Sequence, residues 1–286
     1  MGPRAKSLLR AASLFAAGAL CATLVAVAIA AGLDTSNIRE TSTDSGTRIM
    51  SVRPTGVGLP LVGATGTTGA GDYASALKNY HDSGDYEADL KAVGTRAGAF
   101  LDRKVRGIRH AAGRRCARAK KHGLTGTRLE QACTKPKLAI VLDIDETSLS
   151  NYSCLSAMDF KQATVALAQC LAAASSPAIG ATKGLYDKAL GKGLAVFFIT
   201  GRPDSIPGVR QQTEANLKAS GYQTWQELIL NPELGGPTIP YKSGAREQIE
   251  KQGYRIVVNM GDQESDLTGG HADRAFKLPN PFYFIG

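Results

Sequence analysis

An aliphatic run from Leu138 to Leu142 ends directly before two aspartates, Asp143 and Asp145. A strand that is apolar on both faces is typical of a parallel sheet that helices cover on both sides. Open sheets of this kind place their ligands at the carboxyl ends of the strands. Side chains at i and i+2 of an extended chain point in the same direction. We therefore expect both carboxylates to share one site, unless the following turn redirects them.

Strand and helix patterns alternate along the rest of the chain. The pattern predicts strands over 194–199, 227–230 and 255–260, and helices over 208–220 and 244–252. Such alternation indicates an α/β fold, with a parallel sheet between two layers of helices. About 215 residues follow residue 71, a length that suits one domain with a small cap.

Three further polar sites follow the first pair of aspartates in sequence. The strand over 194–199 ends at Thr200, Lys242 opens a helical segment, and the last strand leads into Gly-Asp262-x-x-x-Asp266. Alone, each has a plain structural explanation: a turn hydroxyl, a solvated lysine, and acids that cap a helix. Four such sites in order, three of them at strand ends, favour a shared function.

These four sites resemble the motifs of the haloacid dehalogenase (HAD) superfamily of phosphohydrolases. The string over 142–152 resembles its subfamily IIIB acid phosphatases, and the segment over 274–283 resembles the end of that branch. The resemblance covers residues 72–286. It implies a Rossmann-like parallel sheet (HAD fold) with an N-terminal helical extension over 72–134. A small helical cap would lie between the first two motifs, over about 150–190.

The resemblance also implies a role for each motif residue. Asp143 would be the nucleophile that forms an aspartyl-phosphate, and Asp145 would be the general acid and base. Thr200 would donate a hydrogen bond to a phosphoryl oxygen, and Lys242 would offset the negative charge of nucleophile and phosphate. For Arg202 and Asp204, shaping the turn after Thr200 is the alternative to substrate contact.

Crowded carboxylates require a cation, and Mg²⁺ suits oxygen ligands of this kind. The implied ligands are the Asp143 carboxylate, the Asp145 backbone carbonyl and Asp262, with Asp266 nearby or acting through water. The predicted function is an exported, magnesium-dependent acid phosphatase acting on small-molecule phosphate monoesters.

Four alternatives to this function differ in how well they fit the sequence. Dehalogenases of the superfamily lack the second aspartate, so Asp145 favours phosphoryl chemistry. Related storage proteins have lost the nucleophile, whereas Asp143 is present. A phosphotransferase that uses the same residues stays open. A non-catalytic surface binding protein that uses a basic helix is the alternative from another class.

Residues 1–32 have the pattern of a targeting segment. Three basic residues precede an apolar stretch over 11–33, which contains the small-x-small sequence Ala28-Ile-Ala30. A cleaved signal peptide and an uncleaved membrane anchor through 11–33 both fit, and we favour cleavage. Either one predicts a secreted or cell-surface protein. Residues 33–71 are rich in Gly, Thr and Ser and predict a flexible linker.

A helix with one apolar stripe is predicted from Tyr86 to Ile108, and Gly84 should separate it from a shorter helix before it. The chain carries a formal charge of +9, and nine Lys or Arg lie between Arg103 and Lys121. This basic segment fits either an anionic partner or the solvated side of an amphipathic helix. It contains no aromatic residue for base stacking, so nucleic acid is not expected as a specific partner.

Five cysteines occur in the chain, and Cys21 lies in the targeting segment. The remaining four form an even set in a protein predicted to be exported, which indicates disulfides. We predict Cys116–Cys133 and Cys154–Cys170, because each bond closes a short local loop. Four free buried thiols are the alternative.

Overall fold

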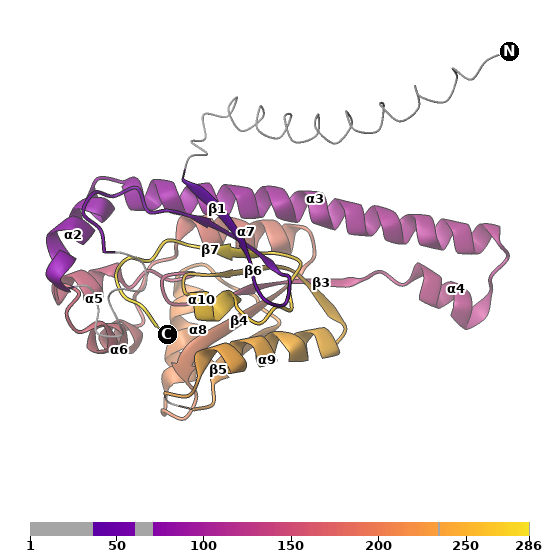
Figure 1. Ribbon diagram of the computed structural model, residues 1–286. Helices are drawn as coiled ribbons and strands as arrows, with labels where there is room; N and C mark the ends of the chain where they lie inside the picture. Colours follow the sequence, from indigo (N-terminus) through magenta and orange to yellow (C-terminus); the bar gives the residue numbers. More distant parts are fainter. Residues whose placement is uncertain (1–36, 61–70, 234, 286) are drawn as a thin grey trace, which may run out of the picture. The chain divides into compact units, whose positions relative to one another are not determined.

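The computed structural model describes residues 37–60, 71–233 and 235–285 (Figure 1). The predicted targeting segment over 1–32 lies outside these residues, and so does the question of its cleavage or anchoring. Within the described ranges, no helix is both long enough and apolar enough to cross a membrane.

The centre of the sheet is β3 (Lys137–Leu142), which pairs in parallel with β4 (Ala195–Pro203) on one side and β6 (Tyr254–Gly261) on the other. The sheet continues to β5 (Glu227–Asn231) beyond β4 and to β7 (Ala275–Lys277) beyond β6, again in parallel. The order β5-β4-β3-β6-β7 is that of a Rossmann-type sheet. The predicted Rossmann-like fold is therefore confirmed.

Two strands extend this sheet where the sequence predicts a flexible linker. Strand β2 (Arg48–Val52) pairs in parallel with β7, and β1 (Ile38–Ser42) lies beyond β2 at the edge. The linker prediction over 33–71 is wrong for these residues. Ile49 and Met50 are buried, so the segment is part of the packed domain.

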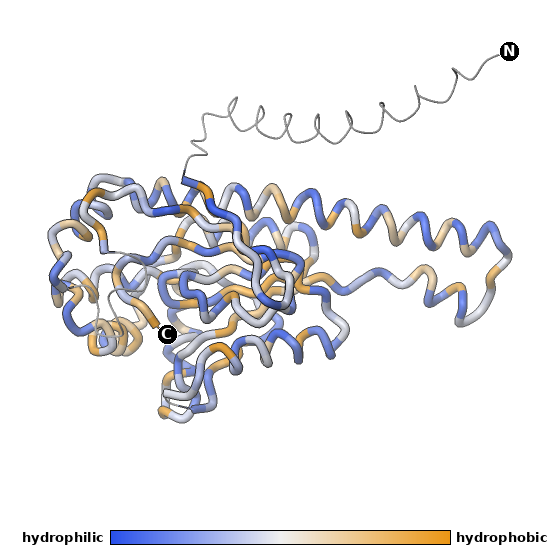
Figure 2. Tube along the Cα trace, viewed as in Figure 1, coloured by the Kyte–Doolittle hydropathy of each residue, from blue (hydrophilic) through white to orange (hydrophobic). Residues whose placement is uncertain are grey.

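Helices cover both faces of the sheet. On one face, α9 (Thr238–Lys251) packs Ala245 and Ile249 into a core that includes Val141 and Phe197 (Figure 1). From Leu138 to Leu142 every residue of β3 is apolar and buried, because helices cover the other face too. Figure 2 shows hydrophobic residues in the central strands.

The long helix α3 (Asp85–Lys121) and α7 (Gly180–Gly191) cover the opposite face (Figure 1). The predicted apolar stripe is confirmed from Tyr86 to Val105, where its members are buried. Gly84 has φ of +88°, a value that glycine adopts easily, and it separates α3 from α2 (Ala74–Asp82). A single 3-10 turn, η1 (Gly71–Tyr73), precedes α2.

The second half of α3 extends beyond the sheet, and α4 (Gly126–Cys133) folds back along it (Figure 1). The Cys116–Cys133 disulfide joins the two helices, with an S–S distance of 1.97 Å. The connection between β3 and β4 begins with α5 (Tyr152–Ala157) and α6 (Ala163–Ala173), which the Cys154–Cys170 disulfide joins. Both predicted disulfide pairings are confirmed.

Helices α5 and α6 occupy the first part of the range predicted for a cap, about 150–190. Helix α7, in the same range, packs its buried residues Leu185 and Ala189 on the sheet side instead. Two further helices complete the fold: α8 (Val209–Ala219) follows β4, and the short α10 (Glu264–Leu267) follows β6.

Candidate active site

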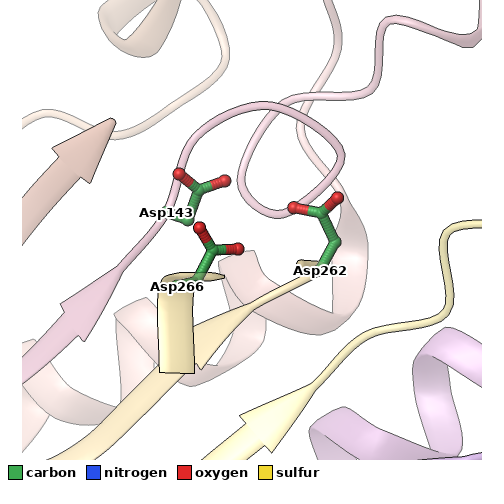
Figure 3. Close-up of side chains that lie close together, drawn as sticks. All are labelled: Asp143, Asp262 and Asp266. Carbon is green, nitrogen blue, oxygen red and sulfur yellow. The ribbon is translucent and has the colours of Figure 1, made fainter. Parts of the chain in front are cut away.

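Three aspartates meet where the strand order of the sheet reverses. Asp143 follows β3 and Asp262 follows the neighbouring strand β6, while Asp266 lies on α10. All three are buried, and they offer carboxylate oxygens within 4.8 Å of one another (Figure 3). The backbone amide of Asp143 donates to the carbonyl of Met260 at 3.0 Å, which holds the two strand ends together. This is the crevice in which open α/β sheets bind ligands.

Lys242 reaches this cluster from α9. Its Nζ donates to Asp143 Oδ1 at 2.6 Å and also pairs with Asp266 Oδ1. Burial opposes the charge of Lys242, but the two carboxylates outweigh burial and hold its pKa above the ordinary value. Burial and the charge of Asp266 raise the pKa of Asp143, although Lys242 acts in the other direction.

Asp145 lies in a different environment from Asp143. Arg202 binds it with two nitrogens, Nε to Oδ2 at 3.0 Å and Nη2 to Oδ1 at 2.7 Å, and Asn151 Nδ2 donates to Oδ1 at 2.8 Å. Burial acts to raise the pKa of Asp145, but the charge and hydrogen bonds of Arg202 outweigh it. The pKa is therefore held below its usual value. This contact shows that Arg202 does more than shape the turn.

Asp262 is fixed by neutral donors. Thr147 Oγ1 donates to its Oδ1 at 2.9 Å, while Gln263 Nε2 and Asn280 Nδ2 donate to Oδ2 at 2.6 and 2.7 Å. Burial and the charge of Asp266 raise the pKa of Asp262 to about 6. Hydrogen bonds from neutral groups hold the carboxylate in place without cancelling its charge.

The glycine directly before Asp262 is required for steric reasons. A Cβ on Gly261 would overlap the Asp266 side chain, so only glycine allows β6 to end directly beneath that carboxylate. The Asp266 Oδ2 atom in turn accepts a hydrogen bond from the Gln263 amide at 2.9 Å, which caps α10. The capping role considered for these acids is therefore real for Asp266, alongside its place in the cluster.

Sequence reasoning did not anticipate the support beneath Asp145. Glu146 is fully buried with φ of +51°, and its Oε1 accepts from the Asn151 amide at 2.6 Å. Tyr283 Oη donates to Glu146 Oε2 at 2.9 Å. Burial, followed by the charge of Asp145, raises the pKa of Glu146 to about 8. Asn151 and Tyr283 lie in the segments 142–152 and 274–283, which resemble the family. That resemblance was the one sequence feature that pointed to them.

Thr200 ends the apolar part of β4 and is fully buried. Its Oγ1 accepts a hydrogen bond from the Arg202 amide at 3.2 Å. The next residues, Gly201 and Arg202, form part of the wall of a cavity of about 420 Å³. Five of the six residues predicted for the site line that cavity directly, namely Asp143, Asp145, Lys242, Asp262 and Asp266.

The residues present fit a bound divalent cation. Asp143, Asp145, Asp262 and Asp266 are carboxylates around one cavity, and the cations paired with them are Lys242 and Arg202. The four carboxylates therefore exceed the two cations by two negative charges, and Asp262 has no cationic partner among these six side chains. Hard divalent ions prefer oxygen donors of this kind and offset such an excess.

Comparison with known proteins agrees with this geometry. The chain is 39% identical over 158 residues to the stem 28 kDa glycoprotein of Glycine max, covering 52% of this chain and 61% of that protein. It is 37% identical over 151 residues to acid phosphatase 1 of Solanum lycopersicum, covering 51% and 58%. The matched parts are thus less than two thirds of either relative.

The fold is similar to that of the class C acid phosphatase from Bacillus anthracis with tungstate bound. The TM-score is 0.50 at 20% identity, covering 75% of this chain and 86% of that one. The sequence profile of the HAD superfamily, subfamily IIIB (acid phosphatase), matches residues 68–286. With most of the chain matched, the protein belongs to subfamily IIIB of the HAD superfamily.

Proposed function

We propose that this protein is an exported, magnesium-dependent acid phosphatase that hydrolyses phosphate monoesters through an aspartyl-phosphate on Asp143. The observation that carries the proposal is the position of Asp143, which lines the cavity and has Lys242 Nζ 2.6 Å from its Oδ1. Membership of the acid phosphatase subfamily supports the same reaction.

In the first step, an Asp143 carboxylate oxygen bonds to phosphorus while the bond to the leaving oxygen breaks. Lys242 offsets the negative charge that gathers on nucleophile and phosphate. Asp145 gives a proton to the leaving alkoxide and then takes one from the water that hydrolyses the acyl phosphate. Thr200 donates a hydrogen bond to a phosphoryl oxygen.

Asp143, Asp262 and Asp266, with the backbone carbonyl of Asp145, would hold the magnesium ion. When bound, the ion supplies positive charge that brings the anionic phosphate and the Asp143 carboxylate together. The buried cluster in Figure 3 supports this assignment, because its acids outnumber the cations paired with them.

Export is supported by two independent features. The sequence begins with a basic and apolar pattern over 1–32. All four cysteines of the described residues form disulfides, which persist in oxidising compartments. We propose that the protein acts outside the cytosol, as a secreted or surface enzyme.

The direct test uses the purified protein and p-nitrophenyl phosphate across a range of pH, with magnesium and then with EDTA. Hydrolysis that requires magnesium and is abolished by Asp143→Asn is expected, because the amide is not a nucleophile. A circular dichroism spectrum like that of the wild type would show that this variant is folded. Normal turnover by folded Asp143→Asn would contradict the assignment.

A further inference from the structure

The cavity above the carboxylates is apolar on the side away from them. Helix α6 of the cap presents one face at helical spacing, with Thr164, Leu167, Ala168 and Leu171 in the wall. The connection from β4 to α8 contributes Ile206 to the same cavity. The phosphate site and this apolar surface therefore belong to one continuous cavity.

The charged residues of the cavity lining are all catalytic groups or their direct partners. The two cations are already paired, Arg202 with Asp145 and Lys242 with Asp143 and Asp266. Among the described residues of the lining, none on the apolar side could pair with a second phosphate or a carboxylate of the substrate. A leaving group with its own charge would lose solvation there without gaining a partner.

Part of the apolar wall remains open to solvent. Ile206 is 42% exposed, and Ile285, which lines the same cavity, is 36% exposed. A ligand that covers these side chains gains the free energy of removing their apolar surface from water.

We propose that the preferred substrates are monoesters of a single phosphate with an uncharged, apolar alkyl or aryl leaving group. The leaving group lies against Leu167, Leu171 and Ile206 while the phosphoryl group faces Asp143. This inference rests on the proposed phosphatase activity and adds the chemical class of its substrate.

The test is a series of n-alkyl phosphates from ethyl to hexyl, whose leaving groups hardly differ in pKa. We expect kcat/KM to rise about fourfold per methylene, from the usual transfer free energy of that group. A flat or falling series would overturn the inference. So would a higher kcat/KM for glucose 6-phosphate than for hexyl phosphate.

Two matched variants on α6 test whether the rise of kcat/KM with chain length comes from the cavity wall. Leu167→Asn places an amide in the wall and should flatten the series, whereas Val165→Asn, on the exposed side of the helix, should keep its slope. Equal slopes in both variants would contradict the assigned wall. If no ester is hydrolysed at all, the phosphatase proposal itself fails; hydrolysis with a flat series overturns only the substrate class.

The parts of α3 and α4 that extend beyond the sheet form a second region of interest. We call residues 106–135 the basic arm. It carries nine Lys or Arg and one acid, Glu130. All nine cations are exposed, and no ion pair among the described residues includes any of them. Figure 2 shows hydrophilic segments along this part of α3.

Between Arg106 and Lys121 the residues that are buried or half-buried form one narrow stripe, namely Ile108, Ala112, Cys116 and Ala119. The cations lie on the wider remaining face of the helix, and all of them are exposed. A groove between α3 and α4 is lined by Arg114, Arg115, Arg118 and His122, with no carboxylate among its lining residues.

We infer that the basic arm binds a linear acidic polysaccharide, with its anionic groups in this groove. A groove lined by several cations and no acid suits a linear anionic chain that can lie along it, whereas a planar bilayer would not enter the groove. The proposed export would bring the basic arm into contact with such polymers. Binding of a polysaccharide by the arm does not require catalytic activity.

Binding of the purified protein to a polygalacturonate column and a heparin column tests this inference. Arg114→Gln with Arg118→Gln should elute at clearly lower salt than Lys91→Gln with Lys218→Gln, which removes the same charge elsewhere. Equal elution of the two double variants would overturn the assigned groove. Tighter retention on anionic vesicles or duplex DNA than on either polysaccharide would overturn the assigned partner.

Discussion

At the scale of single residues, Arg202 gives the two aspartates of the Asp-x-Asp motif opposite electrostatic environments. Asp143 has a raised pKa because it is buried beside Asp266, whereas the guanidinium of Arg202 holds the pKa of Asp145 below its usual value. A general acid acts in its protonated form, which a lowered pKa restricts to acidic solution. The arginine thereby offers a physical reason for an acidic optimum.

Replacing Arg202 should therefore change the pH dependence. In Arg202→Gln the pKa of Asp145 rises, so the alkaline limb of the kcat/KM profile should move to higher pH, with a lower maximum because the carboxylate is less well positioned. Arg210→Gln is the matched control, since Arg210 pairs with exposed Asp204 on the connection after β4. A limb that stays in place in Arg202→Gln would contradict this role.

Gly261→Ala tests the steric requirement beneath the carboxylate cluster. The added methyl group overlaps Asp266 and must displace it. We expect kcat to fall about 100-fold, with more magnesium needed for half-maximal rate. Gly184→Ala is the control, because a Cβ there contacts nothing within 4 Å and should leave kcat unchanged. Wild-type magnesium dependence in Gly261→Ala would refute the packing argument.

The six motif residues could be predicted because four short motifs, three of them after apolar strands, resemble those of a known family. Their partners could not be predicted. Tyr283 reaches Glu146, and Arg202 reaches Asp145, only through tertiary contacts between segments far apart in sequence. Asn151 lies six residues from Asp145, but its contact depends on the conformation of the loop between them.

Residues 151–153 also match the Asn-x-Ser pattern of N-glycosylation acceptors. Asn151 is fully buried and its side chain is hydrogen-bonded to Asp145 and Ser176, which the pattern alone does not reveal.

At the scale of elements, two disulfides of similar loop length serve different parts of the fold. The loops span 17 and 16 residues, for which chain entropy suggests about 3 kcal/mol each. One joins the cap helices α5 and α6, and the other joins α3 and α4 within the basic arm.

Their removal should consequently have different effects on activity. Cys154→Ser with Cys170→Ser should lower the free energy of unfolding by about 2–4 kcal/mol and also lower kcat/KM, because α6 forms the cavity wall. Cys116→Ser with Cys133→Ser should loosen the arm and leave kcat/KM at the wild-type level. Urea unfolding and steady-state kinetics on both variants check this. Equal loss of activity in both would contradict the separation.

Helices and strands could be predicted where the apolar residues follow a local period. Strands that depend on pairing with a segment far away in the chain could not be predicted. The apolar stripe of α3 and the runs of β3, β4 and β6 can be read directly from the sequence. Strands β1 and β2 contain Arg, Thr and Ser and show no clear alternation. Their place in the sheet depends on pairing of β2 with β7, more than 220 positions later in the chain.

At the scale of the whole described molecule, sheet topology builds the site. Alternating strands and helices predicted a parallel sheet, but not which strands are neighbours. The observed order places β6 next to β3, so that Asp143 and Asp262 come together across the crevice. Charge is separated in the same molecule: the acidic cluster is buried, whereas the basic arm holds nine exposed cations.

The central claim is that Asp143 carries the phosphoryl group during turnover. The most direct measurement is to quench the enzyme with acid during hydrolysis, reduce it with borohydride, and analyse its peptides by mass spectrometry. An acyl phosphate is reduced to an alcohol, so the account predicts homoserine at position 143, dependent on substrate. An unmodified Asp143 in enzyme that is turning over substrate, or homoserine at another aspartate, would contradict it.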